Sequence, residues 1–485
     1  MTLKLPIVKK IDSKDSIEPT AFFNNYISKR IPFKFNKIQK LDSIKTQKKC
    51  DVNKWKDFKY LYEKCNKSIV KVEYRSNSKG RFGCGNEKEM TFGKFLNELE
   101  NGNESLYLTT QDLIPKDDGT PTLYTAPLND LVNDFTLQPD IMGNLVLQSC
   151  NLWIGKSTIT NNKNGSNSGL HHDFHDNLYI LLRGKKKFRL FSPNETINLY
   201  PSGNIEKIHS NGRINYTGQL TKADGSAINS ENALAASKAL EKAVDDNLSE
   251  SEIDKALEQV LDAEIEDDFD DFDDYDDYDD CNDDDDGGER EIGRNNEEDK
   301  EEEDDDDYDD EEEESEIEKA VRELKKKQKE EDEENDNDND DSHARKRRKH
   351  HNDDNSNVKA VSTSSSSSLS SEKSKNKPPN FSNVDENNMA WTDIESQYPL
   401  YASARSRALE IEINAGEMLY LPAGWWHDVY SFDGEDSGHM AFNYWFHPPD
   451  QDDQEHPYQS DFWTNQETSS CRNRDGMEKS KKVNN

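Results

Sequence analysis

Residues 171–185 read HHDFHDNLYILLRGK and run from a candidate metal-ligand pair directly into an apolar strand. His171 and Asp173 are two positions apart, so on a strand or at its edge both side chains point to one face and can bind one ion. Two histidines and one carboxylate form a common type of iron site, so one distant histidine would complete the set. Lys186, directly after this stretch, could then hold an acidic cosubstrate beside the metal.

The candidate for the third ligand is His427, which ends the run Pro422-Ala423-Gly424-Trp425-Trp426-His427. Aromatic residues punctuated by proline and glycine are typical of a strand end, which can place a side chain opposite another strand. The pair His171 and Asp173 is weak evidence alone, because a chain with 11 histidines and many aspartates contains roughly one such match by chance. On spacing alone, ordinary surface and core residues therefore stay an open alternative.

Short apolar runs bounded by Gly, Pro, Asn or Asp predict a domain made mostly of β-strands. Helical spacing of aromatic residues and leucines predicts two helices before them, around residues 55–62 and 92–96. The predicted strands span residues 106–108, 144–148, 151–155, 178–182, 187–191, 409–413, 418–421 and 440–446.

The negative charge of the chain is concentrated in one segment. The 485 residues carry a formal net charge of −39, and residues 251–341 alone contain 50 acidic and 10 basic residues. The remainder is nearly neutral, as in an ordinary globular protein. Together with a basic cluster at 345–349 and a serine run at 364–368, the acidic segment has too few apolar residues to bury a core. We therefore expect disorder over 217–378, with at most short helices such as 233–248.

A single folded domain interrupted by this acidic insertion is the predicted organisation. The insertion is far longer than an ordinary loop, which indicates a functional or disordered segment. The expected division is an N-terminal tail at 1–20, the first part of the folded domain at 21–216, the insertion at 217–378, the second part at 379–447 and a polar tail at 448–485.

Cysteine usage and the absence of long apolar runs concern the compartment of the protein. The six cysteines form no CxxC pair, so reduced thiols are expected rather than a zinc ribbon or a disulfide scaffold. No signal peptide is recognisable at the N-terminus and no run approaches ~18 apolar residues. We expect a nuclear or cytoplasmic protein that is neither secreted nor membrane-bound. The cluster at 345–349 fits a nuclear import signal as well as it fits chance.

Three stretches taken together resemble the JmjC (cupin-type) oxygenases that use Fe(II) and 2-oxoglutarate: residues 170–193, 416–427 and 441–445. Within that family the chain is most similar to the small hydroxylase branch, which includes the asparaginyl hydroxylase acting on hypoxia-inducible factor. The resemblance covers residues 20–215 and 380–447. It implies a double-stranded β-helix, or jelly-roll, barrel with flanking helices, interrupted by the acidic insertion.

The resemblance also implies roles for eight residues. His171, Asp173 and His427 match the iron ligands, and they leave three coordination positions for 2-oxoglutarate and O2. Lys186 matches the lysine that pairs with the far carboxylate of 2-oxoglutarate through charge-assisted hydrogen bonds. The other matches are Tyr107, whose hydroxyl would reach the same carboxylate, Ser168, where the family often has threonine, and Asn177 and Asn443, whose amides would contact the cosubstrate or support the site.

Several neighbouring residues receive a structural interpretation. For Asn177 and Asn443, simple hydrogen bonding at strand ends stays open beside the functional role. His172 and His175 fall outside the ligand phase, and His439 and His447 have no assigned role. Barrel core, rather than a substrate cage, is the expected place of Trp425, Trp426, Phe442 and Trp445.

The implied activity is that of a dioxygenase which couples decarboxylation of 2-oxoglutarate to oxidation of a C–H bond. Hydroxylation of a protein side chain is favoured, because the carboxylate ligand is an aspartate and no histone-reading finger is visible. Two alternatives stay open: a histone lysine demethylase, and a weakly active or inactive scaffold that binds basic partners through its acidic insertion. The negative field disfavours direct nucleic-acid binding. Neither the main substrate nor the oligomeric state is indicated.

Overall fold

The structure of the protein is a computed structural model, and the chain divides into two compact units. Unit 1 comprises Met1–Glu231, Tyr275–Cys281 and Asn376–Asn485, and it contains the barrel described below. The basic cluster at 345–349, the serine run at 364–368 and nearly all of the acidic segment lie outside the described residues. The structure describes residues 8–39, 41–43, 45–74, 86–114, 122–157, 166–245, 253, 255–257, 260, 377–434, 438–460 and 462–463.

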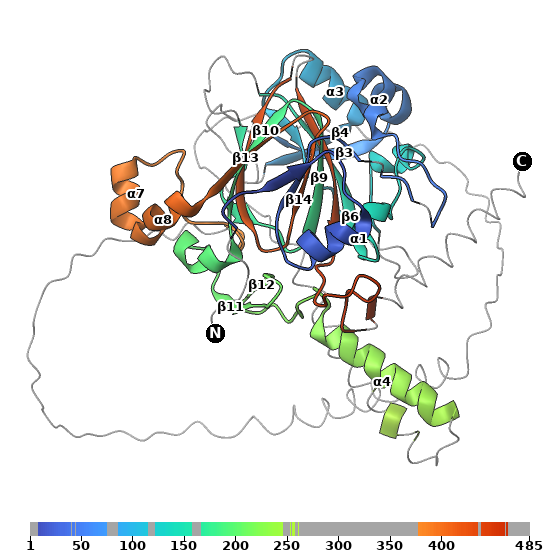
Figure 1. Ribbon diagram of the computed structural model, residues 1–485. Coiled ribbons are helices and arrows are strands. Elements are labelled where there is room, and N and C mark those ends of the chain that lie inside the picture. Colours follow the sequence, from blue (N-terminus) through green and yellow to red (C-terminus); the bar gives the residue numbers. More distant parts are fainter. Residues whose placement is uncertain are drawn as a thin grey trace, which may run out of the picture. The chain divides into compact units, whose positions relative to one another are not determined.

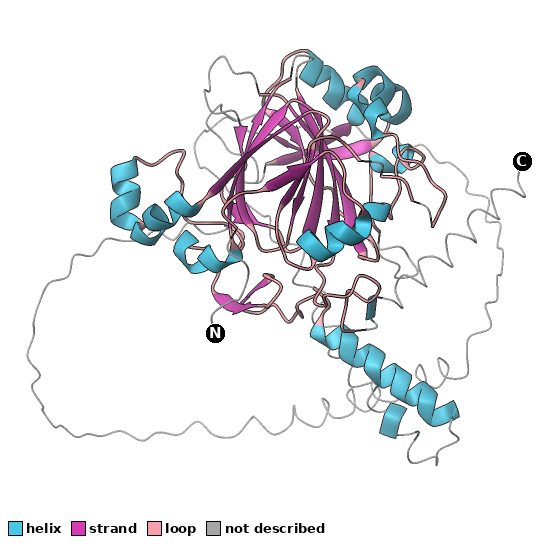
Figure 2. Ribbon diagram, viewed as in Figure 1, coloured by secondary structure: helices cyan, strands magenta, loops and turns pink. Residues whose placement is uncertain are grey.

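The core of unit 1 is a barrel of two β-sheets that face each other, with helices around it (Figures 1 and 2). The larger sheet has the strand order β1-β2-β14-β9-β16-β6-β5-β3-β4. Strand β9 lies between β14 and β16, so segments from both sides of the insertion build this sheet. The strands are β1 (Asp12–Lys14), β2 (Phe33–Phe35), β3 (Ile69–Tyr74), β4 (Glu87–Thr91), β5 (Leu106–Leu108), β6 (Leu147–Gly155), β9 (Asp176–Arg183), β14 (Met418–Leu421) and β16 (His439–Phe446).

The smaller sheet forms the opposite wall of the barrel and carries the candidate metal ligands. Its order is β13-β10-β15-β7, and β8 pairs with the beginning of β15. Because β10 pairs with both β13 and β15, this sheet also joins the two sides of the insertion. Its strands are β7 (Ser166–Asn167), β8 (His171–His172), β10 (Lys185–Phe191), β13 (Leu409–Asn414) and β15 (Trp426–Phe432), and β11 (Ile205–Ile208) forms a separate pair with β12 (Ile214–Tyr216).

Strand β9 shows how the apolar run in the sequence is used. All of its residues are buried, and their side chains alternate between two apolar clusters. Leu178, Ile180 and Leu182 pack in the cluster that also contains the helix residues. Tyr179 and Leu181 pack in the cluster between the two sheets. A strand covered on both faces needs apolar residues at nearly every position, which is why this run is continuous instead of alternating.

The predicted mainly β, jelly-roll-like barrel with flanking helices is confirmed. Several strands, among them β1 to β4, lie outside the predicted runs, and two other regions differ in detail. The runs 144–148 and 151–155 belong to the single strand β6, because Ser149 and Cys150 between them also pair with β16. This strand begins at Leu147. His427 is the second residue of β15, a strand that the sequence analysis did not predict. The charged Asp428 interrupts the apolar pattern there, although it is buried beside Arg189.

Both helices predicted before the strands are present. Asp57 caps α2 by accepting a hydrogen bond of 2.9 Å from the Lys59 amide, and Thr91 caps α3. Leu61 of α2 packs inward, whereas Tyr62 is 43% exposed. No helix in the described part of the chain is long and apolar enough to cross a membrane. The helices are α1 (Pro19–Phe22), α2 (Phe58–Cys65), α3 (Phe92–Glu100), α4 (Ile228–Asp245, inside the predicted insertion), α7 (Trp391–Gln397) and α8 (Pro399–Ala404).

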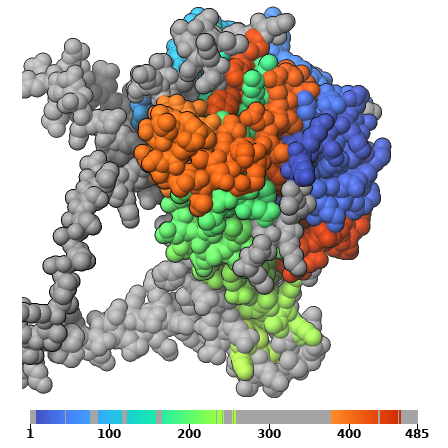
Figure 3. Space-filling model, turned by 60° about the vertical axis from the view of Figure 1, so that its left-hand side comes forward, coloured from blue at the N-terminus to red at the C-terminus, as the bar shows by residue number. Residues whose placement is uncertain are grey.

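The segment after the insertion packs against the segment before it. The Ser202 amide donates to the carbonyl of Phe381, and the Asn383 amide donates to the carbonyl of Tyr200, each over 2.8 Å. Figure 3 shows the orange residues that follow the insertion lying against green residues that precede it. Residues near 200 and near 381 therefore form one region of the barrel, next to β8.

Candidate metal and cosubstrate site

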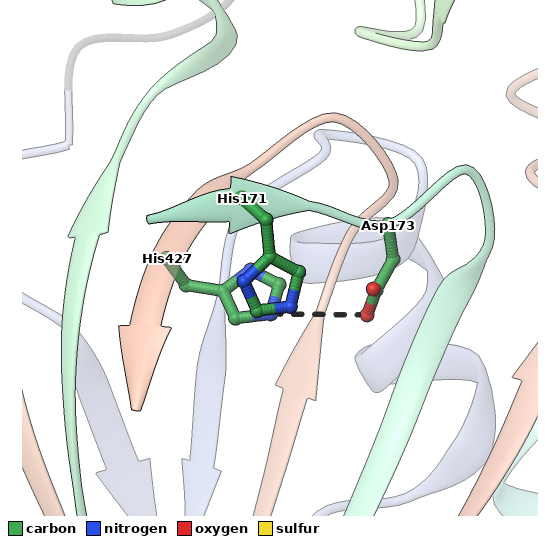
Figure 4. Close-up of side chains that lie close together, drawn as sticks. All are labelled: His171, Asp173 and His427. Carbon is green, nitrogen blue, oxygen red and sulfur yellow. Dashed lines mark ion pairs between the residues drawn. The ribbon is translucent and has the colours of Figure 1, made fainter. Parts of the chain in front are cut away.

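The candidate metal ligands meet where β8 pairs with the beginning of β15 (Figure 4). His171 lies directly opposite His427 in this antiparallel pair, and their ring centroids are 4.3 Å apart. Asp173 follows β8, and its Oδ2 lies 3.9 Å from Nε2 of His427. One ligand atom from each of the three residues lies within 4.8 Å of the others. The structure thus brings together the three ligands that the sequence analysis proposed.

Each imidazole ring is held from the side that faces away from this centre. Nδ1 of His171 lies 2.9 Å from the Gly169 carbonyl, and Nδ1 of His427 lies 3.0 Å from the Trp425 carbonyl. Because a carbonyl only accepts, each Nδ1 carries the proton and each Nε2 keeps a lone pair for a metal. Burial, reinforced by the neighbouring His427, lowers the pKa of His171 to about 4, so this ring is neutral at physiological pH.

The carboxylate ligand is supported by two asparagines. Burial by itself would raise the pKa of Asp173, but His427, His171 and the Asn177 amide outweigh it and hold this pKa below its usual value. Nδ2 of Asn177 donates to Oδ2 of Asp173 over 3.2 Å. Nδ2 of Asn443 in turn donates to Oδ1 of Asn177 over 3.1 Å. Both asparagines therefore support the charged form of Asp173 in this structure.

Phe381 contacts the site from the far side of the insertion, and the sequence analysis missed it. Its ring stacks on the imidazole of His171 with a centroid distance of 4.9 Å and an interplanar angle of 14°. Their backbones also form an antiparallel bridge. His171 is thus packed between Phe381 and His427. No pattern in the sequence pointed to this contact, because it depends on how the chain returns after the insertion.

A buried cation lies on the same inner wall. Lys186 is 2% exposed, and its ammonium donates to the Ser431 hydroxyl over 2.6 Å and lies 5.8 Å from the Tyr107 ring centroid. No carboxylate among the described residues lies within ion-pair distance of it. Burial lowers the pKa of Lys186 to about 7. A buried ammonium without a counter-ion is costly, so this arrangement suits a bound anion.

The strand register relates the lysine to the metal ligands. Lys186 pairs with Ser431, and Leu190 pairs with His427, in the ladder between β10 and β15. Side chains two or four positions apart on a strand share a face, so His427 and Ser431 both point into the barrel. Their Cα atoms are about 13 Å apart at roughly 3.3 Å per residue. Strand alternation was thus a signal that could have identified Ser431, which the sequence analysis missed.

The Ser168 hydroxyl is engaged with the backbone. It donates to the Gly169 carbonyl over 3.1 Å and accepts from the Val429 amide over 3.1 Å, so Ser168 extends the pairing of β7 with β15. Its expected contact with a cosubstrate stays a prediction. The same holds for Tyr107, which is placed beside Lys186 as the resemblance implies, and whose pKa burial raises above the usual value.

Other conspicuous residues pack away from the three ligands. His172 contacts the Tyr216 hydroxyl over 2.7 Å, on the opposite face of β8 from His171. The ring of His175 lies 5.4 Å from that of His447, and His439 lies 5.8 Å from Tyr107. The aromatic residues expected in the core are Trp425, Trp426 and Phe442, which are fully or almost fully buried, and Trp445, which is half-buried.

Comparison with known proteins agrees with this geometry. A model of the cupin-like domain family matches residues 19–452. JmjC domain-containing protein 4 of Schizosaccharomyces pombe is 31% identical over 479 residues, which cover 94% of this chain and 87% of that protein. The chain belongs to the JmjC-type cupin family. A lysine-specific demethylase of Arabidopsis thaliana, JMJ30, is 30% identical over 156 residues, which cover 30% of this JmjC protein and 31% of the relative.

The family assignment gives the donor set a chemical meaning. JmjC proteins are typically oxygenases that use Fe(II) and 2-oxoglutarate. Two imidazole nitrogens and one carboxylate oxygen, gathered on one side of a centre, are the ligands of non-haem Fe(II) oxygenases, and they leave positions open for other ligands. His171, Asp173 and His427 of this JmjC protein fit such an ion.

Proposed function

We propose that this protein is an Fe(II)- and 2-oxoglutarate-dependent dioxygenase that hydroxylates a protein side chain. One observation carries the proposal: the metal-ligand triad and the buried Lys186 lie on adjoining strands of the same barrel wall. A triad alone would serve many metals, and a buried lysine alone would serve many anions. Together they suit a ligand that chelates a metal at one end and carries a carboxylate at the other.

The residues of the chain would have separate tasks in this reaction. Fe(II), when bound with 2-oxoglutarate and O2, supplies the chemistry that inserts oxygen into a C–H bond. His171, Asp173 and His427 would hold the metal, and the Gly169 and Trp425 carbonyls would keep the two rings oriented. Lys186 and Ser431 would hold the far carboxylate of 2-oxoglutarate. The apolar walls of the barrel exclude water, which strengthens these charged contacts.

The choice between hydroxylation and demethylation depends on the substrate. Hydroxylation is supported by the aspartate ligand and by the resemblance to the small hydroxylases. Demethylation of lysine is the second candidate, because one relative is named as a lysine-specific demethylase, although that match covers only 30% of this chain. Both reactions would consume 2-oxoglutarate and form succinate, so they differ only in the fate of the oxidised carbon.

The test uses the full-length protein with Fe(II), ascorbate and 2-oxoglutarate. Succinate formation in the wild type, and its loss in Asp173→Ala, is the expected result. Mass spectrometry of a lysate treated with each variant should then reveal peptides heavier by one oxygen atom only with the active protein. Methyl loss with formaldehyde release would favour the demethylase. Partner capture that persists in Asp173→Ala, without succinate formation by the wild type, would instead support the scaffold interpretation.

The acidic segment suggests the kind of protein substrate. Residues 251–341 carry 50 acidic and 10 basic residues, which would attract basic proteins in the nucleus or cytoplasm. We therefore propose a substrate or partner with basic segments. Binding of a lysine-rich peptide to the full-length protein should weaken steeply as the salt concentration rises. Salt-independent binding would contradict this attraction.

A further inference from the structure

Three hydrogen bonds in series link Trp153 of β6 to the candidate metal ligand Asp173. Nε1 of Trp153 donates to Oδ1 of Asn443 over 2.8 Å. The chain continues from Asn443 to Asn177 over 3.1 Å and from Asn177 to the Asp173 carboxylate over 3.2 Å. The strands β6, β16 and β9 are neighbours in the larger sheet, so this chain crosses three strands before it reaches the site.

The chemistry of its two ends fixes the donor-to-acceptor direction of this hydrogen-bond chain. An indole N–H can only donate, and an ionised carboxylate can only accept. Between these ends, the amides of Asn443 and Asn177 must each accept through oxygen and donate through nitrogen. The hydrogen bonds in the structure follow this order at every step. All three bonds therefore support one another, and Asp173 receives an N–H at the oxygen nearest to His427.

Loss of the Trp153 indole N–H would affect Asp173, at the other end of the hydrogen-bond chain. Asn443 is completely buried, so its Oδ1 would have no access to water in place of Trp153. A buried amide oxygen without a partner is unfavourable, which favours rotation of the Asn443 amide. Rotation withdraws the N–H from Asn177, whose own amide is then free to turn from Asp173. The Asp173 carboxylate would remain beside His171 and His427 but would no longer be held in one orientation.

We propose that Trp153 is a positioning residue of the metal site, which acts through Asn443 and Asn177 to orient the Asp173 carboxylate. This inference rests on the proposed metal site. It predicts that removal of a single N–H group, with no change at any metal ligand, weakens metal binding. Residues that hydrogen-bond to a metal ligand typically contribute 10- to 100-fold to metal affinity. We expect about tenfold for Trp153, which is three hydrogen bonds away from the metal ligand.

The experiment measures Co(II) binding to the full-length protein, because the visible absorption of Co(II) reports its ligand geometry. Trp153→Phe should bind Co(II) about tenfold more weakly and with an altered spectrum. In an Asn443→Leu background, adding Trp153→Phe should cause no further loss, because the chain is already broken.

The matched control is Trp55→Phe. It also removes a buried indole donor, which bonds to Asp134 over 3.0 Å outside the site, so it should lower thermal stability and leave Co(II) binding unchanged. Wild-type affinity and spectrum in Trp153→Phe would overturn the inference. An equal loss in both Asn443 backgrounds would also overturn it, since it would indicate packing alone. Failure of the wild type to bind Co(II) would instead refute the metal site itself.

Discussion

The site in the barrel has two parts of opposite charge preference. The metal half consists of His171, Asp173 and His427, and the cosubstrate half consists of Lys186 and Ser431. At the metal half, the Asp173 carboxylate and the Nε2 atoms of His171 and His427 gather around one point, and no lysine or arginine of the described residues lies within ion-pair distance of Asp173. At the other half, the ammonium of Lys186 donates to the Ser431 hydroxyl, and no anionic partner for it lies among the described residues. Each half is incomplete alone. Together the two halves fit the proposed ligand, a metal ion chelated by 2-oxoglutarate, and each half can be disabled separately.

Removing the metal half should have the largest effect. His171→Ala deletes one of three ligands, so we expect succinate formation to fall by more than about 100-fold, beyond the range for residues that only support a ligand. Activity measured with saturating 2-oxoglutarate checks this. The exposed His456 gives the control, since His456→Ala should retain full activity. Near-normal turnover in His171→Ala would exclude the triad as the metal site.

Neutralising the other half should leave metal binding intact and weaken the cosubstrate. Lys186→Met removes a charge-assisted hydrogen bond worth about 1.5–3 kcal/mol, so the KM for 2-oxoglutarate should rise about 10- to 100-fold. Co(II) affinity should not change. Lys187→Met is the matched control, because this neighbouring lysine is exposed and faces Glu412 at 3.9 Å. An unchanged KM in Lys186→Met would sink the assignment of the anion site.

The protonation of Lys186 makes the cosubstrate half of the site sensitive to pH. Burial lowers its pKa to about 7, so the free protein loses this charge as the pH rises through neutrality. A bound carboxylate favours the ammonium form and raises that pKa, so binding takes up a proton above about pH 7. Affinity for 2-oxoglutarate should be full below about pH 7 and should fall by up to about tenfold per unit above it. Isothermal titration between about pH 6 and 9 checks this slope, which Lys186→Met should abolish.

The smallest expected effect concerns the contact that the segment after the insertion makes with the metal half. Phe381→Ala removes the ring stacked on His171, and stacking of this kind contributes about 0.5–1.5 kcal/mol. Co(II) affinity should fall about 2- to 10-fold, while the KM for 2-oxoglutarate measured at saturating metal stays the same. Phe381→Tyr keeps the stacked ring and serves as the control. A loss in Phe381→Tyr equal to that in Phe381→Ala would contradict this stacking role.

The sequence predicted the parts of the site that depend on local spacing. His171 and Asp173 share a face because they are two positions apart. The residues around them suggested His427 and Lys186, and the resemblance then implied the role of each. Short apolar runs, such as the one that became β9, predicted a mainly β domain, and the resemblance implied the barrel. These parts could be predicted because strand periodicity and the family pattern are both visible in the order of residues along the chain.

The parts that escaped prediction depend on which strands become neighbours. Trp153 was correctly interpreted as a strand residue, but its bond to Asn443 exists only because β6 lies beside β16. Ser431 lies in β15, which was not predicted as a strand because Asp428 interrupts its apolar pattern. Phe381 contacts His171 only because the chain returns to β8 after the insertion. Pairing across a sheet is a property of the whole fold, so no local pattern contained the contacts of Trp153 and Phe381.

The central place of β9 has a consequence for how the protein is made. Both of its neighbours, β14 and β16, are synthesised after the insertion, so β9 leaves the ribosome long before either partner strand exists. At 5–20 residues per second, roughly 10 to 50 s separate the completion of β9 from that of β16. During that time a strand with five consecutive apolar residues, 178–182, has two unpaired edges, which are prone to aggregation. The nascent chain is therefore expected to need chaperone protection until its last strand emerges.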